Sequence, residues 1–234
     1  KEGADIIDVG GESSRPGSKS ISVKEEIRRI VPVIDILARK TDAIISVDTY
    51  KHEVARVAFA AGAHMLNLIK GVPASDNLIR LCGQYGAAVI LMHMRGDPRN
   101  MQSRVIYNDV LAEVIAGLKR SVEKCYRFGL NACNIVVDPG IGFAKTCEQN
   151  LFLLNKLSNF RRIGCPILVG TSRKSFIGKI LGLDVDERLL GTAASVVCAV
   201  HNGAHIVRVH DVQKIKQVVM MADAIINSKG KVIL

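Results

Sequence analysis

Short, nearly continuous apolar runs recur along the chain and alternate with helical patterns, and this alternation is what most constrains the fold. The runs are rich in Val, Ile and Leu, as expected for strands buried on both faces of a parallel sheet. The predicted strands cover residues 4–10, 43–48, 63–69, 88–94, 134–140, 166–172 and 205–211. Apolar residues recur at helical spacing over residues 23–40, 52–61, 76–85, 109–128, 148–159, 187–201 and 212–227. The alternation predicts an α/β protein with a parallel sheet.

The repeated βα units favour a (βα)8 TIM barrel, formed by a single domain over residues 1–234 that lacks its first βα unit. An open, doubly wound sheet with seven strands is the alternative. The chain enters its first predicted strand almost at once, and residues 1–3 resemble the end of a preceding helix, with Gly3 at its cap. We therefore expect the first strand and most of the first helix to be absent from this chain, because seven strands alone leave two unpaired edges.

Composition limits the partners and the compartment. No apolar run approaches the roughly 20 residues needed to span a bilayer, so no membrane partner is expected. The net charge of +10 suits an anionic ligand, but the charges are spread along the chain and only four Tyr and six Phe could stack on bases, which disfavours nucleic acid. The six scattered cysteines indicate reduced thiols and a cytoplasmic protein, or an organellar one in a eukaryote, where a targeting segment would not be visible.

Polar residues collect where the predicted strands end, which is where barrels of this kind carry their active sites. Asp48, Asn67 and Asp138 together supply fixed acceptors and one amide donor, a set that suits one edge of a flat heterocycle with amino and ring N–H groups. Lys174 could donate a hydrogen bond from the opposite edge. Each aspartate also has a structural interpretation, because Asp48 could cap the next helix and Asp138 could make a turn.

Arg208 and His210 stand two residues apart on the last predicted strand, so their side chains point the same way and could hold an anion. The loops after the last two strands of many barrels bind phosphate. Capping of the following helix is the structural alternative for His210. No G-x-S-x-G, H-E-x-x-H or P-loop pattern occurs, and His93 fits a packed histidine better than a metal ligand. The predicted site binds and polarises its ligand and has no covalent nucleophile.

Six segments resemble the dihydropteroate synthase family of pterin-binding enzymes, in the family's order. They are DVGGESSRPG (8–17), ISVDTYK (45–51), LMHMRGDPRNMQ (91–102), VDPGIGFAK (137–145), GTSRKSFIG (170–178) and RVHDV (208–212). The resemblance implies a (βα)8 barrel, usually a homodimer. It also implies transfer of 6-hydroxymethyl-7,8-dihydropterin from its diphosphate to p-aminobenzoate in folate biosynthesis, with Mg2+ bound and diphosphate released. Sulfonamides, which mimic p-aminobenzoate, would act on such an enzyme.

The resemblance also assigns roles to residues by motif. The pterin would be held by Asp48, Asn67, Asp138 and Lys174, with Met92 and Gly170 lining its pocket. Arg208 and His210 would bind the diphosphate and, with Lys174, form the catalytic set. The p-aminobenzoate site would comprise Ser14, Arg15, Pro16, Phe143 and Ser175. No metal ligand is expected in this chain, since the family's asparagine for Mg2+ would precede Lys1, where a fused pyrophosphokinase domain could also lie.

Two alternative functions remain open. Leu68 follows Asn67 where the family usually has aspartate, which motivates a pterin-binding paralogue without synthase activity. A pterin-binding methyltransferase domain would share the acidic and amide residues, but it does not need the S-R-K-S and R-V-H cation sets. Arg173 has no assigned contact with either substrate, and we expect it to order its loop and shape the p-aminobenzoate pocket.

Overall fold

Seven parallel strands form the centre of the computed structural model, which describes residues 2–13, 18–69, 75–96 and 105–228. The strands are β1 (Ile6–Gly10), β2 (Ile44–Asp48), β3 (Met65–Leu68), β4 (Ala88–Met92), β5 (Ile135–Asp138), β6 (Leu168–Val169) and β7 (Ile206–Val207). Strands β1 to β5 form one sheet in sequential order, β6 pairs with β7, and a single bridge between Val137 and Ile167 joins the two sets. Sequential order without a reversal is the order of a barrel, so the doubly wound alternative is wrong.

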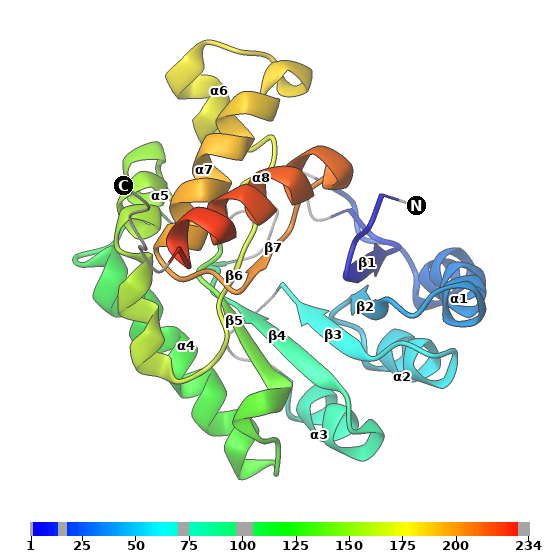
Figure 1. The fold of residues 1–234 in the computed structure, drawn as a ribbon. Helices are drawn as coiled ribbons and strands as arrows, with labels where there is room; N and C mark the ends of the chain where they lie inside the picture. The colour runs from blue at the N-terminus through cyan, green and yellow to red at the C-terminus, as the bar shows by residue number, and fades with distance from the viewer. Residues whose placement is uncertain (1, 14–17, 70–74, 97–104, 229–234) are drawn as a thin grey trace.

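Helices connect the strands and cover the outside of the sheet (Figure 1). They are α1 (Val23–Lys40), α2 (His52–Ala60), α3 (Asp76–Tyr85), α4 (Val110–Arg127), α5 (Cys147–Asn155), α6 (Ser175–Leu181), α7 (Leu189–His201) and α8 (Val212–Ile226). Helix α6 was not predicted, because seven residues containing Gly178 are too few to show a helical period. Three short 3-10 helices complete the connections, at Ala132–Asn134, Leu157–Ile163 and Val185–Glu187. No helix in the described ranges is long and apolar enough to cross a membrane.

Local sequence signals set where several helices begin. The Ser22 side chain accepts a hydrogen bond from the Glu25 N–H at the start of α1, and Asp109 does the same for α4. Thr146 and Gln149 form a reciprocal capping box at the start of α5. These caps satisfy N–H groups that the helix itself leaves without partners, so the elements around the sheet begin at defined residues.

Alternation along the strands separates the core from the barrel interior. Ile45 and Val47 of β2 belong to the large cluster between the sheet and the helices. The residues of the opposite parity point inward, where a smaller apolar cluster fills the lower interior: Met65, Ile90, Val136 and Leu168, with Ile206 packed against them. The next inward positions toward the carboxyl end are polar on β2, β3 and β5, where they hold Asp48, Asn67 and Asp138, and on β4 the position holds Met92.

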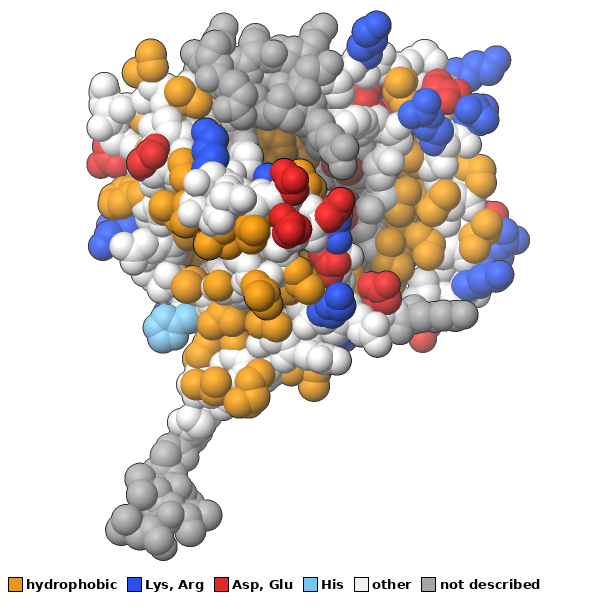
Figure 2. Space-filling model, turned by 90° about the horizontal axis from the view of Figure 1, so that it is seen from above, with side chains coloured by type: hydrophobic (Ala, Val, Ile, Leu, Met, Phe, Trp, Pro, Cys, Tyr) orange, Lys and Arg blue, Asp and Glu red, His pale blue; other side chains and the backbone are white. Residues whose placement is uncertain are grey.

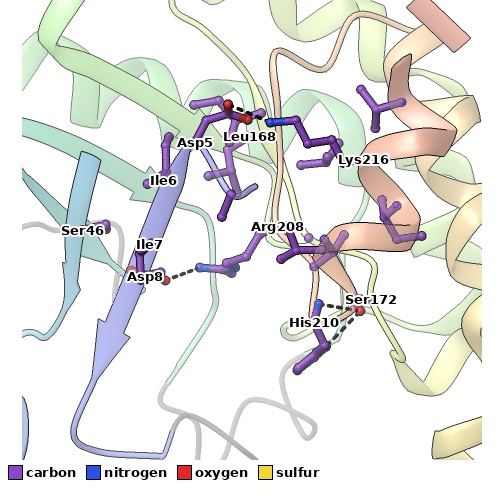
Figure 3. Close-up of a pocket in the computed structure, with 18 of the residues that line it drawn as sticks. Asp5, Ile6, Ile7, Asp8, Ser46, Leu168, Ser172, Arg208, His210 and Lys216 are labelled. Atoms are coloured by element: carbon purple, nitrogen blue, oxygen red, sulfur yellow. Dashed lines mark hydrogen bonds and ion pairs between the residues drawn. The ribbon is translucent and has the colours of Figure 1, made fainter. Parts of the chain in front are cut away.

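A cavity of about 600 Å³ opens between β1 and β7. In the part of the chain that is described, no strand pairs with the free edge of either β1 or β7. Ile7 and Asp8 line the cavity on one side, and Arg208 lines it on the other (Figure 3). The barrel interior is thus accessible between two strand edges whose N–H and C=O groups could pair with another strand.

The turn after β5 predicts an unequal response to two equivalent substitutions. Gly140 has φ +70°, and a Cβ there would overlap the His93 carbonyl oxygen, whereas Gly86 ends α3 at φ +62° with no described atom within 4 Å of its Cβ position. We expect Gly86→Ala to lower the free energy of unfolding by about 1 kcal/mol and Gly140→Ala by about 3 kcal/mol or more, since the second adds overpacking to backbone strain. Urea denaturation of both variants measures this. Equal losses would contradict the described turn.

Candidate active site

The strand register brings the predicted acidic and amide residues to one end of the barrel. Asp48 of β2 pairs in register with Asn67 of β3, and Met92 of β4 pairs with Asp138 of β5. All four belong to the inward-facing parity described above, so their side chains surround the same upper interior. The prediction that these strand ends form one site is confirmed for their placement, while their binding roles stay predictions.

Asn67 is fully buried and only half satisfied. Its Nδ2 donates to Asp8 Oδ2 at 2.8 Å, but its Oδ1 has no hydrogen-bond partner among the described residues. A buried acceptor without a partner costs about 1–3 kcal/mol. The carbonyl oxygen is therefore available for a donor supplied by a ligand.

Asp8 is a site residue that the sequence reasoning missed. It lies in the middle of β1 rather than at its end, and its Oδ2 also approaches Arg208 Nη1 at 3.4 Å (Figure 3). A signal for it existed in the sequence, because a charged residue inside an otherwise apolar run marks the inward-facing parity of a strand.

Asp48 carries the most perturbed carboxyl group at this end of the barrel. Burial, reinforced by the negative charge of Asp8, raises its pKa to about 7, although the Arg208 charge acts in the opposite direction. Asp48 does not cap α2, whose N-cap is Lys51. The structural alternative for Asp48 is therefore wrong, and its carboxyl group is poised between neutral and charged forms near pH 7.

The two carboxylate oxygens of Asp138 have different surroundings. Its Oδ1 accepts a hydrogen bond from the Gly140 N–H at 2.7 Å, which makes the predicted turn. Its Oδ2 lies 3.7 Å from Arg208 Nη2. One oxygen thus fixes the loop after β5, and the other faces the centre of the site.

Arg208 lies among these carboxylates. Burial alone would lower the pKa of its guanidinium, but the charges of Asp138, Asp8 and Asp48 outweigh burial and raise it above its ordinary value. Gly170, which follows β6, lies beside this side chain, and a Cβ there would be in ordinary van der Waals contact with Arg208 Nε at 3.4 Å. Arg208 stays charged and lines the cavity together with His210, as the sequence predicted for their shared direction.

His210 is held by Ser172 from the neighbouring loop. Its Nδ1 lies 2.9 Å from Ser172 Oγ, and its backbone N–H donates to the same oxygen at 3.2 Å (Figure 3). Helix α8 begins at Val212 with Asp211 as its N-cap, so the capping role considered for His210 is wrong. The ring is exposed on the cavity wall and anchored through one nitrogen.

Lys174 projects across the loop after β5. Its Nζ donates to the Ile141 carbonyl oxygen and lies 4.7 Å from the centroid of the Phe143 ring. Burial lowers its pKa to about 7, against the opposing effect of Asp138. Its ammonium therefore sits beside both the acidic end of the barrel and an aromatic ring.

The remaining predicted residues surround this centre. Met92 is fully buried in the cluster that Phe143 packs against, and Ser175 is exposed at the first turn of α6. Ser14, Arg15 and Pro16 lie outside the described residues. The segments that flank them are joined at their base, where Glu12 Oε2 accepts from the Ile21 N–H at 3.0 Å and from Lys51 Nζ at 2.7 Å.

Two neighbouring residues belong to the packing. Leu68 points away from the site into the core between sheet and helices. His93 is buried with its Nδ1 3.5 Å from Lys145 Nζ, and burial lowers the pKa of its imidazole to about 3, which confirms the packed interpretation. Among the described residues, no group of three or more His, Cys, Asp and Glu side chains is arranged to hold a metal ion.

The raised pKa of Asp48 predicts a pH-dependent gain in stability for Asp48→Asn. The folded state holds a proton on Asp48 up to about pH 7, whereas the unfolded chain releases it near pH 4, so ionisation of Asp48 lowers stability as pH rises through this window. Asparagine does not titrate. Between pH 5 and pH 8, the unfolding free energy of the variant should therefore rise relative to the parent by about 2 kcal/mol.

Urea denaturation at both pH values measures this difference, with Asp42→Asn, an exposed residue before β2, as the matched control. A gap between Asp48→Asn and the parent that does not change with pH would contradict the assigned environment of Asp48.

Comparisons with known proteins agree with this arrangement. The model of the pterin-binding enzyme family matches residues 1–210. The dihydropteroate synthase of Synechocystis sp. is 46% identical over 224 residues, which are 95% of this chain and 78% of that protein.

Two solved structures are also similar. The Yersinia pestis dihydropteroate synthase, solved with a sulfonamide drug complex, superposes with a TM-score of 0.93 at 37% identity, over 97% of this chain and 82% of that one. The Thermus thermophilus enzyme, solved with 4-aminobenzoate, superposes with a TM-score of 0.89 at 39% identity, over 95% and 85% of the two chains. Together with the barrel, the inward-facing acids and the loops that carry Lys174 and Arg208, these similarities show that the chain belongs to the dihydropteroate synthase family of pterin-binding enzymes.

Proposed function

We propose that this protein is a dihydropteroate synthase, a transferase of folate biosynthesis. It would join p-aminobenzoate to 6-hydroxymethyl-7,8-dihydropterin diphosphate and release diphosphate and 7,8-dihydropteroate. The observation that carries the proposal is a buried acceptor without a partner among the described residues, Asn67 Oδ1, on a side chain that shares the Asp8 carboxylate with Arg208. The names of the similar proteins support the same activity.

The pterin would occupy the upper barrel interior. Its amino group and ring N–H groups would donate to Asp48, Asn67 Oδ1 and Asp138, which lie at the ends of β2, β3 and β5. Lys174 would donate to the ring from the opposite side, and Met92 and Gly170 would shape the pocket. Such a ligand satisfies groups that the protein otherwise buries at a cost, which favours specific binding over a merely apolar contact.

The reaction asks the protein to stabilise a departing anion. When the bond between the pterin methylene carbon and the diphosphate oxygen breaks, the electron pair leaves with the diphosphate. Arg208 and the exposed His210, together with Lys174, would stabilise that charge from fixed positions, and the bound amine would then attack the methylene carbon. No covalent nucleophile is required, in agreement with the residues that surround the cavity.

The p-aminobenzoate would bind beside the pterin, near Phe143 and Ser175. Phe143 offers an aromatic face next to the Lys174 ammonium, and Ser175 offers an exposed hydroxyl and backbone N–H at the start of α6. Ser14, Arg15 and Pro16 are proposed for the same site by motif. Binding of sulfonamides by this protein would follow from the same contacts, as the Yersinia pestis complex suggests by analogy.

A protein-held Mg2+ does not fit the described residues. The Asp8 carboxylate is already engaged by Asn67 and Arg208, and the described part of the chain contains no group of three or more His, Cys, Asp and Glu side chains arranged to hold a metal ion. Mg2+ is commonly bound by substrate phosphates with one or two protein oxygens. A requirement for Mg2+ therefore remains a proposal. A strand pairing with the free edges of β1 and β7 would supply further ligands and complete the proposed eight-stranded barrel.

The structure removes the reason for proposing a pterin-binding paralogue without synthase activity. Leu68 packs in the core on the outward parity of β3, so leucine at this position changes the packing rather than the site. A pterin methyltransferase would not need the cations Lys174, Arg208 and His210, which line the cavity. We propose a cytoplasmic enzyme with small-molecule substrates and no nucleic-acid or membrane partner, and an upstream pyrophosphokinase domain remains a prediction.

We also propose that the protein is a homodimer. Helices α7 and α8 pack together and expose Leu190, Met220, Met221 and Ile225, each more than half exposed. The face that Figure 2 views, over the upper helices of Figure 1, carries many hydrophobic side chains next to one another. Apolar surface of this kind on a soluble enzyme is typical of a subunit interface.

Sedimentation analysis tests the dimer. Met221→Glu should convert a dimeric protein to monomers, because a charge buried in an apolar interface is not paired. Ile106→Glu, at an apolar residue before α4 that is also more than half exposed, is the matched control and should leave the dimer intact. A parent protein that sediments as a monomer at micromolar concentration, or a Met221→Glu dimer, would contradict the proposal.

Turnover and pterin affinity test the function. The full-length protein should form dihydropteroate from the two substrates, and Arg208→Ala should abolish most of this activity. Lys174→Ala should weaken pterin binding by about 10- to 150-fold, since a hydrogen bond from a charged group contributes about 1.5–3 kcal/mol. Lys179→Ala, at an exposed position of helix α6, which begins after Lys174, is the control. Absence of turnover in the parent protein would overturn the proposed function.

A further inference from the structure

Arg173 has a backbone conformation that needs an explanation. Its φ is +56°, in the left-handed region that costs a residue with a side chain about 1–2 kcal/mol. Such residues persist where surrounding contacts hold them, and they concentrate at functional sites. Arg173 is one of two non-glycine residues with positive φ in the described part of the chain.

The contacts that hold Arg173 come from several elements. Its N–H donates to Thr192 Oγ1 at 3.1 Å, and its carbonyl oxygen accepts from Arg188 Nη1 at 3.1 Å. Its guanidinium makes two parallel bonds to Asp211, from Nε to Oδ2 at 3.1 Å and from Nη2 to Oδ1 at 2.9 Å. A third bond, from Nη1 to Asp186 at 3.0 Å, reaches a carboxylate that is 92% exposed. A two-bond arginine–carboxylate pair fixes both distance and orientation.

Asp211 is committed to this pair. It occupies the N-cap of α8, where an aspartate ordinarily accepts from the helix's own N–H groups, yet it makes no such bond. Its carboxylate is directed to Arg173 instead, and the hydrogen bonds from Arg173 hold its pKa below the ordinary value. The helix thus forgoes a usual cap in favour of a contact between two loops.

The pair also joins the two segments that carry the proposed cations. Lys174 directly follows Arg173 in the loop after β6, and His210 directly precedes Asp211 in the loop after β7. A second contact between these segments, between Ser172 Oγ and His210 Nδ1, is made by the residues that directly precede Arg173 and Asp211. The relative position of Lys174 and His210 is therefore set by the contacts of their immediate neighbours.

We propose that Arg173 and Asp211 form a clamp, hereafter the loop clamp, that positions Lys174 and His210 relative to each other. The loop clamp consists of positioning residues, which touch neither substrate and act through the cations beside them. This inference rests on the proposed function, because the two cations serve the two ends of pterin diphosphate. Misplacement of a reacting group by about 1 Å can cost about 100-fold in rate, so the clamp's effect belongs on turnover.

The test compares two aspartates that contact the same arginine. In the full-length protein, Asp211→Asn should lower kcat by about 10- to 100-fold and weaken binding of inorganic diphosphate, while the melting temperature changes little. Asp186→Asn removes the exposed partner and should stay within about twofold of the parent in kcat. Equal kcat and diphosphate affinity in Asp211→Asn and Asp186→Asn would overturn the clamp.

A second variant separates the guanidinium from the strained backbone. Arg173→Gly removes the side chain at a φ that glycine adopts without strain, so it should lose turnover like Asp211→Asn without losing stability. Combining the two should cost no more than either alone, because both remove one interaction. Additive losses, or failure of both variants to fold, would assign the pair to general stability and overturn its positioning role.

The parent protein separates this inference from the proposed function. Turnover by the parent together with full activity of Asp211→Asn would overturn the clamp alone. Absence of turnover and of diphosphate binding in the parent would overturn the proposed function first.

Discussion

The charge balance around Arg208 is the interaction on which the site depends. Its guanidinium lies 3.4 Å from an oxygen of Asp8 and 3.7 Å from one of Asp138, with Asp48 close enough to affect its pKa. A central cation lowers the electrostatic cost of placing three inward-facing acids at one end of a barrel. Even with it, burial raises the pKa of Asp48 to about 7 and lowers that of Lys174 to about 7. The Arg208 charge stabilises the three carboxyl groups, but it does not fully offset the cost of burying them.

This partial satisfaction connects stability with function. The unpaired Asn67 Oδ1 and the raised pKa of Asp48 both cost folding energy, and the core between sheet and helices offsets that cost. A ligand with several N–H donors on one edge and an anionic leaving group would satisfy the acceptors and meet the cations at once. Binding sites commonly retain such locally unfavourable groups because they are used when the ligand arrives.

The fold could be predicted from sequence largely because strands buried on both faces appear as short, nearly continuous apolar runs. The apolar runs identified all seven strands, and the polar residues at their ends identified one end of a barrel. The exact length of β6 and β7 could not be predicted, since only two residues of each pair in the ladder. Helix α6 was missed because seven residues containing Gly178 show no period. These limits arise from tertiary contacts that extend or shorten elements beyond their local preference.

The site was predictable in its members and less so in its connections. Asp48, Asn67 and Asp138 could be predicted because they are polar residues at the ends of strands. Asp8 lies inside a strand, and only the parity of β1 shows that it faces inward. The expected loop-ordering role of Arg173 agrees with its contacts, whereas its partner Asp211 is 38 residues away and could not be inferred from spacing. Leu68 illustrates the converse, because a departure from a motif proved to lie on the core side of its strand.

The most direct test of the account is a crystal structure of the protein with 6-hydroxymethylpterin bound. The account predicts the pterin in the upper barrel interior, with Asn67 Oδ1 accepting a hydrogen bond from it and Asp48 and Asp138 facing the same edge. A pterin bound elsewhere, or one that leaves Asn67 Oδ1 without a partner, would contradict the claim that these buried acceptors form the recognition surface.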